Sequence, residues 1–79
     1  MSEYKQHDRH EHDQYNHMRD LYSQAVAAYK KRKYTRAAEL YDRILARFPD
    51  ADLVLYNQGL TLLKMGRLSE AAASFTRAT

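Results

Sequence analysis

The sequence predicts an all-α fold built from two tandem helix–turn–helix hairpins, and three observations support this prediction. The chain matches itself without a gap at an offset of 34 residues, from Met18 to its end. It contains only 2 Gly and 1 Pro in 79 residues, whereas Ala, Leu, Lys, Arg and Gln are frequent, which favours helices over a sheet. Its apolar residues recur at three- and four-residue steps, as they do along one face of a helix.

The 34-residue period rests on 7 identical pairs among 28 aligned positions. The identical pairs are Leu21 and Leu55, Tyr22 and Tyr56, Gln24 and Gln58, Lys30 and Lys64, Ala37 and Ala71, Ala38 and Ala72, and Arg43 and Arg77. A period of this length is typical of one supersecondary unit that stacks on its own copies instead of folding alone.

The N-terminal segment, residues 1–12, shows no apolar periodicity, so we expect a polar, His-rich, flexible tail there. The first unit is predicted over residues 13–51, with an N-terminal helix extension. Its helical stripe begins at Tyr15 and is interrupted by the basic segment Lys30–Lys33. Thr35 is the expected cap of the next helix. Pro49 is expected to stop that helix, because the residue before a proline is pushed out of the α region.

The second unit is predicted over residues 52–79, and by the repeat count its second helix is truncated. Asp50 or Asp52 is the expected cap of its first helix, which runs to about Met65. Gly66 then supplies the turn, and Ser69 is the expected cap of the last helix.

Composition excludes several classes of function. The chain has no Cys, which excludes disulfides, thiolate nucleophiles and Cys-ligated zinc. No apolar run approaches the length of a membrane span and the N-terminus is polar, so we expect a cytoplasmic protein that does not enter the membrane. There is no recognisable nucleophile motif and no glycine-rich phosphate loop, so we expect no enzyme and no cofactor.

Residues 18–79 resemble the tetratricopeptide repeat, whose pattern W-x₂-L-G-x₂-Y…A-x₃-F…P has a 34-residue period. The matching positions of the second unit are Gly59, Leu62, Ala71 and Phe75, and those of the first unit are Ala25, Ala37, Tyr41 and Pro49. Leu21 and Leu55 stand where the pattern has tryptophan, Gln24 and Gln58 stand where it has leucine, and Ala28 leaves an aromatic site underfilled. These departures predict loose packing and modest stability. Ala71 is expected where paired helices approach closely, and Ala38 at the helix surface, where a larger side chain is tolerated.

The resemblance implies a protein-interaction scaffold, in which the first helices of successive units line a groove for a peptide or a partner helix. Transferred to this chain, the partner-binding residues would be Arg19, Tyr22, Val26, Tyr29, Lys30, Leu53, Tyr56, Asn57, Leu60, Leu63 and Lys64. The carboxylate clamp of some chaperone adaptors is not expected, because Tyr22 and Val26 stand where that clamp needs Lys and Asn.

The N-terminal histidines offer an alternative function, a metal-responsive module. The weak candidate ligands are His7, His10, His12, Asp13 and His17, whose imidazoles and carboxylate suit zinc, nickel or copper. Their spacing matches no closed metal site. The run Lys30–Lys33 could attract phosphates, but it spans a turn where positive charge complements a helix C-terminus, so nucleic-acid binding is not expected.

The sequence also predicts self-association. Arrays of such repeats usually need three or more units, and this sequence has two. The predicted helix after residue 52 is apolar around most of its circumference, and leaving it wet would expose a large apolar patch. We therefore expect a homodimer or a higher homo-oligomer, with the hairpin of residues 53–79 at the contact.

Overall fold

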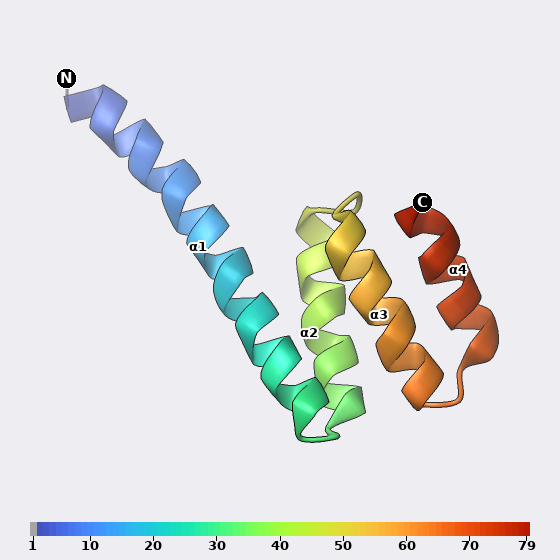
Figure 1. Ribbon diagram of the computed structural model, residues 1–79. Helices are drawn as coiled ribbons and strands as arrows, with labels where there is room; N and C mark the ends of the chain where they lie inside the picture. The colour runs from blue at the N-terminus through green and yellow to red at the C-terminus, as the bar shows by residue number, and fades with distance from the viewer. Residues whose placement is uncertain (1) are drawn as a thin grey trace.

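The computed structural model describes the backbone of residues 2–79 and the side chains of residues 16–79. Four helices follow one another: α1 (Ser2–Lys30), α2 (Tyr34–Arg47), α3 (Asp52–Lys64) and α4 (Leu68–Ala78) (Figure 1). Each helix packs against its neighbours in the chain, α1 against α2, α2 against α3 and α3 against α4. The prediction of an all-α fold with two helical hairpins is confirmed.

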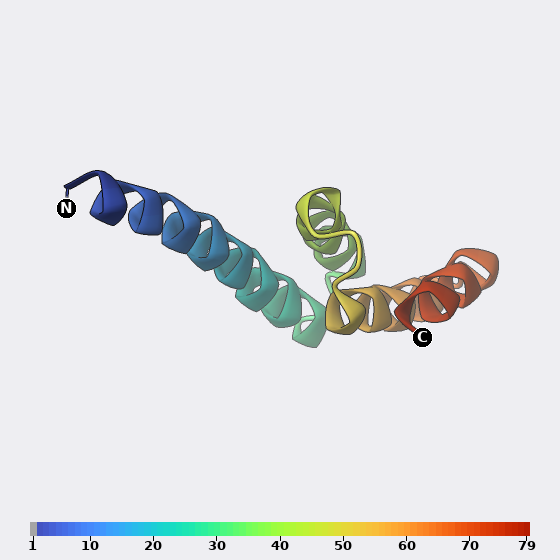
Figure 2. The same ribbon diagram turned by 90° about the horizontal axis from the view of Figure 1, so that it is seen from above.

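The arrangement places α2 on one side of both α1 and α3 (Figure 2). The helices α1 and α3 run in the same direction, so their C-terminal ends lie at the same end of the molecule (Figure 1). The turn between α1 and α2 and the turn between α3 and α4 therefore also lie at that end.

The first helix is longer than the sequence indicated. A tail was expected over residues 1–12, but α1 begins at Ser2 and continues without a break to Lys30. Residues 2–12 contain Glu, Lys, Gln and Arg and no Gly or Pro, so they favour a helix without an apolar stripe that would reveal it. The first part of α1 projects past the rest of the molecule (Figure 1).

The expected side-chain caps were wrong. The helices α2, α3 and α4 follow Lys33, Ala51 and Arg67, and none of these three N-cap residues makes a side-chain cap hydrogen bond. The expected caps Thr35, Asp52 and Ser69 all lie inside the first helical turn, and Asp50 lies before the N-cap. The geometry of the preceding turn sets where α2 and α4 begin.

That turn geometry is the same in both units. Arg32 and Gly66, which are 34 residues apart, both have a positive φ, 63° and 77°. The backbone N–H of the next residue closes the helix in each case, from Lys33 to the Ala28 carbonyl at 2.8 Å and from Arg67 to the Leu62 carbonyl at 2.9 Å. This hydrogen bond with a left-handed residue at its centre is a Schellman motif, and it confirms the expected turn at Gly66.

The connection between the two hairpins ends α2 at Arg47. Phe48, the residue before Pro49, has φ −126° and ψ 72°, outside the α region. The prediction that Pro49 stops this helix is confirmed. On the other side of the connection, Arg77 of α4 donates a hydrogen bond from Nη2 to the Pro49 carbonyl at 3.0 Å.

The hydrophobic core has α2 at its centre. The side chains of Leu40, Tyr41 and Ile44 are almost fully buried between α1 and α3. Ala25, Ala37 and Ala71 are completely buried, as their place at close helix contacts requires. Ala38, expected at the surface, is only 7% exposed, because α3 packs over it: its carbonyl accepts a hydrogen bond from Gln58 Nε2.

Candidate partner-binding groove

A groove runs between α1 and α3, and α2 forms its floor. Near the C-terminal ends of these helices the groove contains a cavity of about 310 Å³. Its lining residues are Tyr22, Val26, Tyr29 and Lys30 of α1, Tyr41 of α2, and Asn57 and Leu60 of α3. We call it the lower cavity. Its walls are mostly aliphatic and aromatic, with a few polar groups, which is the composition of many peptide and ligand sites.

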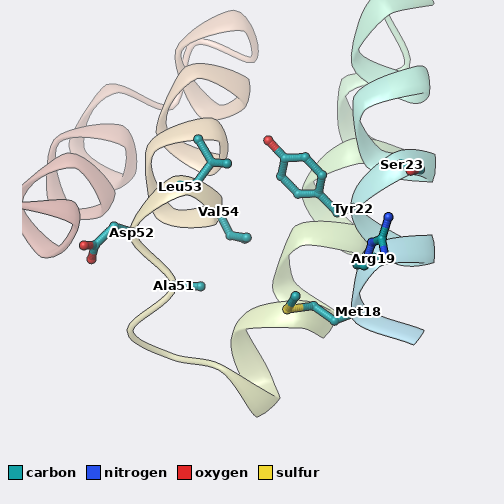
Figure 3. Close-up of a pocket in the computed structure, with 8 residues that line it drawn as sticks. All are labelled: Met18, Arg19, Tyr22, Ser23, Ala51, Asp52, Leu53 and Val54. Atoms are coloured by element: carbon teal, nitrogen blue, oxygen red, sulfur yellow. The ribbon is translucent and has the colours of Figure 1, made fainter. Parts of the chain in front are cut away.

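A second cavity, the upper cavity, lies toward the start of α3 and has a volume of about 350 Å³ (Figure 3). Its lining residues are Met18, Arg19, Tyr22 and Ser23 of α1, and Ala51, Asp52, Leu53 and Val54 at the start of α3. Met18 and Tyr22 point across the gap toward Val54 and Leu53 (Figure 3). Arg19 and Asp52 put one positive and one negative side chain on its border.

Tyr22 lines both cavities, and a hydrogen bond crosses the groove between them. The Asn57 Nδ2 donates to the Tyr22 hydroxyl oxygen at 2.6 Å, which links α3 to α1. Both residues were predicted to bind a partner, and in the free chain they bind each other. This bond was not predicted, because it joins residues of different units that are 35 positions apart in the sequence.

The tyrosine that recurs at Tyr22 and Tyr56 packs against the aromatic residue of its own hairpin. The ring of Tyr22 lies 6.0 Å from the ring of Tyr41, and the ring of Tyr56 lies 5.6 Å from that of Phe75. These two pairs are again 34 residues apart. The repetition of this tyrosine thus has a packing reason in addition to any role in binding, an aromatic contact that is edge-on in the first pair and tilted in the second.

Tyr41 brings a phenol to the floor of the lower cavity. Burial, together with smaller contributions from the neighbouring phenols of Tyr22 and Tyr29, raises the pKa of Tyr41 to about 12. The hydroxyl therefore stays protonated at neutral pH and is able to donate a hydrogen bond.

The remaining predicted residues divide into three groups. Arg19 borders the upper cavity, whereas Val26, Tyr29, Lys30 and Leu60 line the lower one. Leu63 and Lys64 are exposed and line neither cavity. Sequence reasoning missed several residues of the upper cavity, namely Met18, Ser23, Ala51, Asp52 and Val54, which are brought together by the crossing of α1 and α3.

Tyr56 belongs to a different surface at the outer side of the second hairpin, which we call the end face, and Leu53 lines both this surface and the upper cavity. The end face contains a shallow cavity of about 650 Å³ lined by Asp52, Leu53, Tyr56, Phe75, Ala78 and Thr79. Leu53 is 61% exposed and Tyr56 is 51% exposed. Tyr56 was predicted as part of the groove, but here its ring lies against α4.

The predicted metal ligands stay without a structural test. His7, His10, His12 and Asp13 lie outside the residues whose side chains are described, and His17 is exposed. Among the described side chains, no three His, Cys, Asp or Glu lie close enough together to hold a metal ion. None of the described helices is both long enough and apolar enough to cross a lipid bilayer.

Comparison with known proteins supports the repeat assignment. A model of the tetratricopeptide repeat family matches residues 22–79, which is most of the chain. No curated protein and no solved structure gave a significant match. The family typically forms non-catalytic scaffolds that mediate protein–protein interactions, and no catalytic domain is found in this chain. With its two helical hairpins, its 34-residue period and this match, the chain belongs to the tetratricopeptide repeat family.

Proposed function

We propose that this chain is a non-enzymatic, cytoplasmic interaction module that binds a peptide or a partner helix in the groove between α1 and α3 and that associates with itself through the end face. One observation carries the groove proposal. Six of the residues predicted for partner binding, among them Val26, Tyr29 and Leu60, line one apolar cavity with polar groups at its border. A cavity of this kind suits one or two apolar anchor side chains of a bound segment.

Val26 and Leu60 are the most informative positions in the groove. Both side chains are partly exposed and line the lower cavity, and neither packs against the buried core cluster. Tyr22 is a poorer choice for a test, because it contacts both Tyr41 and Asn57 inside the protein. Charged residues at Val26 and Leu60 would therefore block an apolar anchor and leave the fold intact.

The experiment compares captured partners across three tagged versions of the full chain. Val26→Glu with Leu60→Glu should lose the partners that the wild type retains from a cell extract, as identified by mass spectrometry. Ala27→Glu with Ala73→Glu makes the same change of charge at two exposed positions outside the groove and should retain them. Equal partner sets for the wild type and the groove variant would place the binding surface elsewhere.

Self-association is supported by the end face. The part of the first hairpin that α3 covers includes Tyr22, Ala38 and Tyr41, and the 34-residue period repeats these as Tyr56, Ala72 and Phe75. Ala38 is buried and Ala72 is exposed, because within residues 2–79 no helix lies over the second set. A surface already shaped to receive a helix, with Leu53 and Tyr56 exposed on it, suits a second copy of the chain.

The metal-responsive alternative has no observation in its favour among the described residues, whose only candidate ligand is the exposed His17. A metal titration that leaves the melting temperature and the histidine NMR signals unchanged would remove it.

A further inference from the structure

We propose that the groove binds an acidic amphipathic segment, with apolar side chains in the lower cavity and carboxylates on a lysine-rich edge beside it. This inference rests on the proposed groove function and names the chemistry of the partner. It begins from the position of the two inter-helix turns, which lie at the same end of the molecule (Figure 1). Besides Arg67, which is paired with Glu70, the two turns carry five exposed basic residues, which we call the basic edge: Lys30, Lys31, Arg32, Lys33 and Lys64.

The charges of the basic edge are not neutralised within the described part of the chain. The acidic residues nearest in sequence, Glu39 and Glu70, are paired with arginines outside the basic edge. Glu39 Oε2 lies 3.9 Å from Arg36 Nη1, and Glu70 Oε1 lies 3.2 Å from Arg67 Nε. Among the side chains of residues 16–79, no further ion pair within 4.0 Å is found. The edge is therefore a surface of one sign that would attract carboxylates.

Helix stability explains only part of this charge. Lys30 and Lys64 lie in the last turns of α1 and α3, where positive charge complements the helix dipole. Lys33, however, is the N-cap of α2, and the first turn of α2 contains no acidic residue but includes Arg36. Positive charge at a helix N-terminus is unfavourable. A carboxylate from a partner would offset this unfavourable charge, which favours binding of an acidic group beside the N-terminus of α2.

The basic edge is continuous with the lower cavity, because Lys30 belongs to both. An apolar side chain placed between Val26 and Leu60 would bring the following residues of a bound segment to the lysines. At the other end of the groove, Arg19 and Asp52 offset each other, so the upper cavity has no such preference. The two ends differ in charge, and the acidic end of the segment should lie at the turns.

A nucleic acid fits this surface less well than an acidic peptide. Proteins that bind single strands stack bases on exposed aromatic faces. The aromatic rings near the basic edge are already engaged: Tyr29 lies edge-on to Tyr34 at 5.4 Å, and Tyr41 is buried against Tyr22. What remains open is an apolar cavity for an aliphatic or aromatic side chain, which a peptide supplies.

The test measures fluorescence anisotropy of labelled probes with the full chain. The main probe is an amphipathic helical peptide with a leucine stripe and a glutamate-rich end. Two versions of it carry glutamine or lysine in place of the glutamates, and a single-stranded thymidine oligonucleotide is the fourth probe. We expect the order glutamate, then glutamine, then lysine, and an affinity for the glutamate peptide that falls as salt is added.

Two matched double variants test whether the lysines of the basic edge are the charges that attract the peptide. Lys31→Glu with Lys33→Glu should weaken binding of the glutamate peptide about tenfold, because two exposed attractive contacts become repulsive. Arg43→Glu with Arg47→Glu produces the same change in net charge on the far part of α2 and should leave the affinity within about twofold. Circular dichroism checks that both variants fold.

The possible results separate this inference from the groove function itself. Equal affinity for the glutamate and glutamine peptides, with binding still blocked by Val26→Glu, would overturn the acidic partner and keep the groove. Tighter binding of the oligonucleotide than of any peptide would overturn it in favour of nucleic acid. Failure of all peptides to bind would overturn the groove proposal and this inference with it.

Discussion

A Cβ atom on Gly59 would lie 2.5 Å from Cε1 and 2.7 Å from Cδ1 of Phe75, so the phenylalanine ring occupies the space that any side chain at residue 59 would need. The ring belongs to α4 and the glycine to α3, and their contact sets how closely the helices of the second hairpin approach. The first hairpin uses Ala25 and Tyr41 at the same repeat positions. Glycine is thus required at residue 59 by space, since its backbone is ordinary helix.

The contact between Gly59 and Phe75 predicts that a Gly→Ala substitution at residue 59 lowers the free energy of unfolding, the opposite of its usual effect in a helix. In an unhindered helix, Gly→Ala stabilises by about 1 kcal/mol. Gly59→Ala should instead destabilise the protein by about 1 kcal/mol, because overpacking costs about 1–3 kcal/mol and exceeds that gain. In a Phe75→Ala background, which lacks the ring, the same substitution should stabilise. Urea unfolding followed by circular dichroism measures all four proteins. A stabilising effect of Gly59→Ala in the wild type would show that the ring moves aside freely.

The turn at Arg32 offers a stabilising substitution. Its φ of 63° is unfavourable for a residue with a side chain, whereas Gly66 has the same role at φ 77°. Arg32→Gly should therefore raise the free energy of unfolding by about 0.5–1 kcal/mol. Gly66→Ala should lower it by about 1 kcal/mol through the backbone alone, since its Cβ would meet nothing within 4 Å. Lys31→Gly, one residue earlier, is the control, and a gain there as large as at Arg32 would contradict the backbone explanation.

The repeat period made much of this fold predictable. Because the two units have the same backbone conformation, the period located both hairpins and the turn at Gly66. It also located the buried positions of Ala25, Ala37 and Ala71. The helix starts were not predictable from capping residues. The starts of α2 and α4 follow from the Schellman turns, and the left-handed residue of the first turn is an arginine, which carries no turn signal.

The candidate site was predictable only in part. The family resemblance named Val26, Tyr29 and Leu60 as groove residues, but not the residues that meet there through helix crossing, such as Met18 and Val54. Periodicity also treats both units alike, although within residues 2–79 only the first is covered by a following hairpin. For this reason Ala38 and Ala72 are identical in sequence and opposite in burial.

Gln58 shows the same asymmetry and supports a further prediction. Its side chain is 5% exposed, and Nε2 donates to Asp42 Oδ1 at 2.6 Å and to the Ala38 carbonyl at 3.3 Å. Its Oε1 is buried without a hydrogen-bond partner in the structure. Gln58→Leu should stabilise the protein by about 1 kcal/mol, because it removes a buried unpaired oxygen and Asp42 is exposed enough to turn to water.

Gln24 is the matched control for Gln58, being the same residue at the same repeat position but exposed. Gln24→Leu should change the unfolding free energy by less than about 0.5 kcal/mol. Thermal and urea unfolding of both variants decide the matter. A marked loss of stability in Gln58→Leu would mean that the hydrogen bond to Asp42 is worth more than the unpaired oxygen costs.

The raised pKa of Tyr41 predicts that the protein loses stability at high pH. Burial raises its pKa from the ordinary 10.0 to about 12, so between these values the folded state holds a proton that the unfolded state has released. The stabilisation is complete below about pH 10 and is lost as the pH rises through about 12. In an ultraviolet titration of tyrosinate, one phenol should ionise late, and Tyr41→Phe should remove that late step. A Tyr41→Phe protein with an unchanged titration tail would assign the late step to another tyrosine.

The last prediction concerns self-association through the end face. Leu53 and Tyr56 are exposed beside Phe75 and Ala78, on a surface that repeats the one α3 covers in the first hairpin. Sedimentation equilibrium from micromolar to millimolar concentration should give a mass above the 9.3 kDa of one chain. Tyr56→Lys should weaken the association at least tenfold, because a charge at the centre of an interface must lose its water without gaining a partner. Ala46→Lys, at an exposed position of α2, should not. A folded wild-type protein that stays monomeric at every concentration would contradict the proposal, and the end face would then be a tolerated apolar surface.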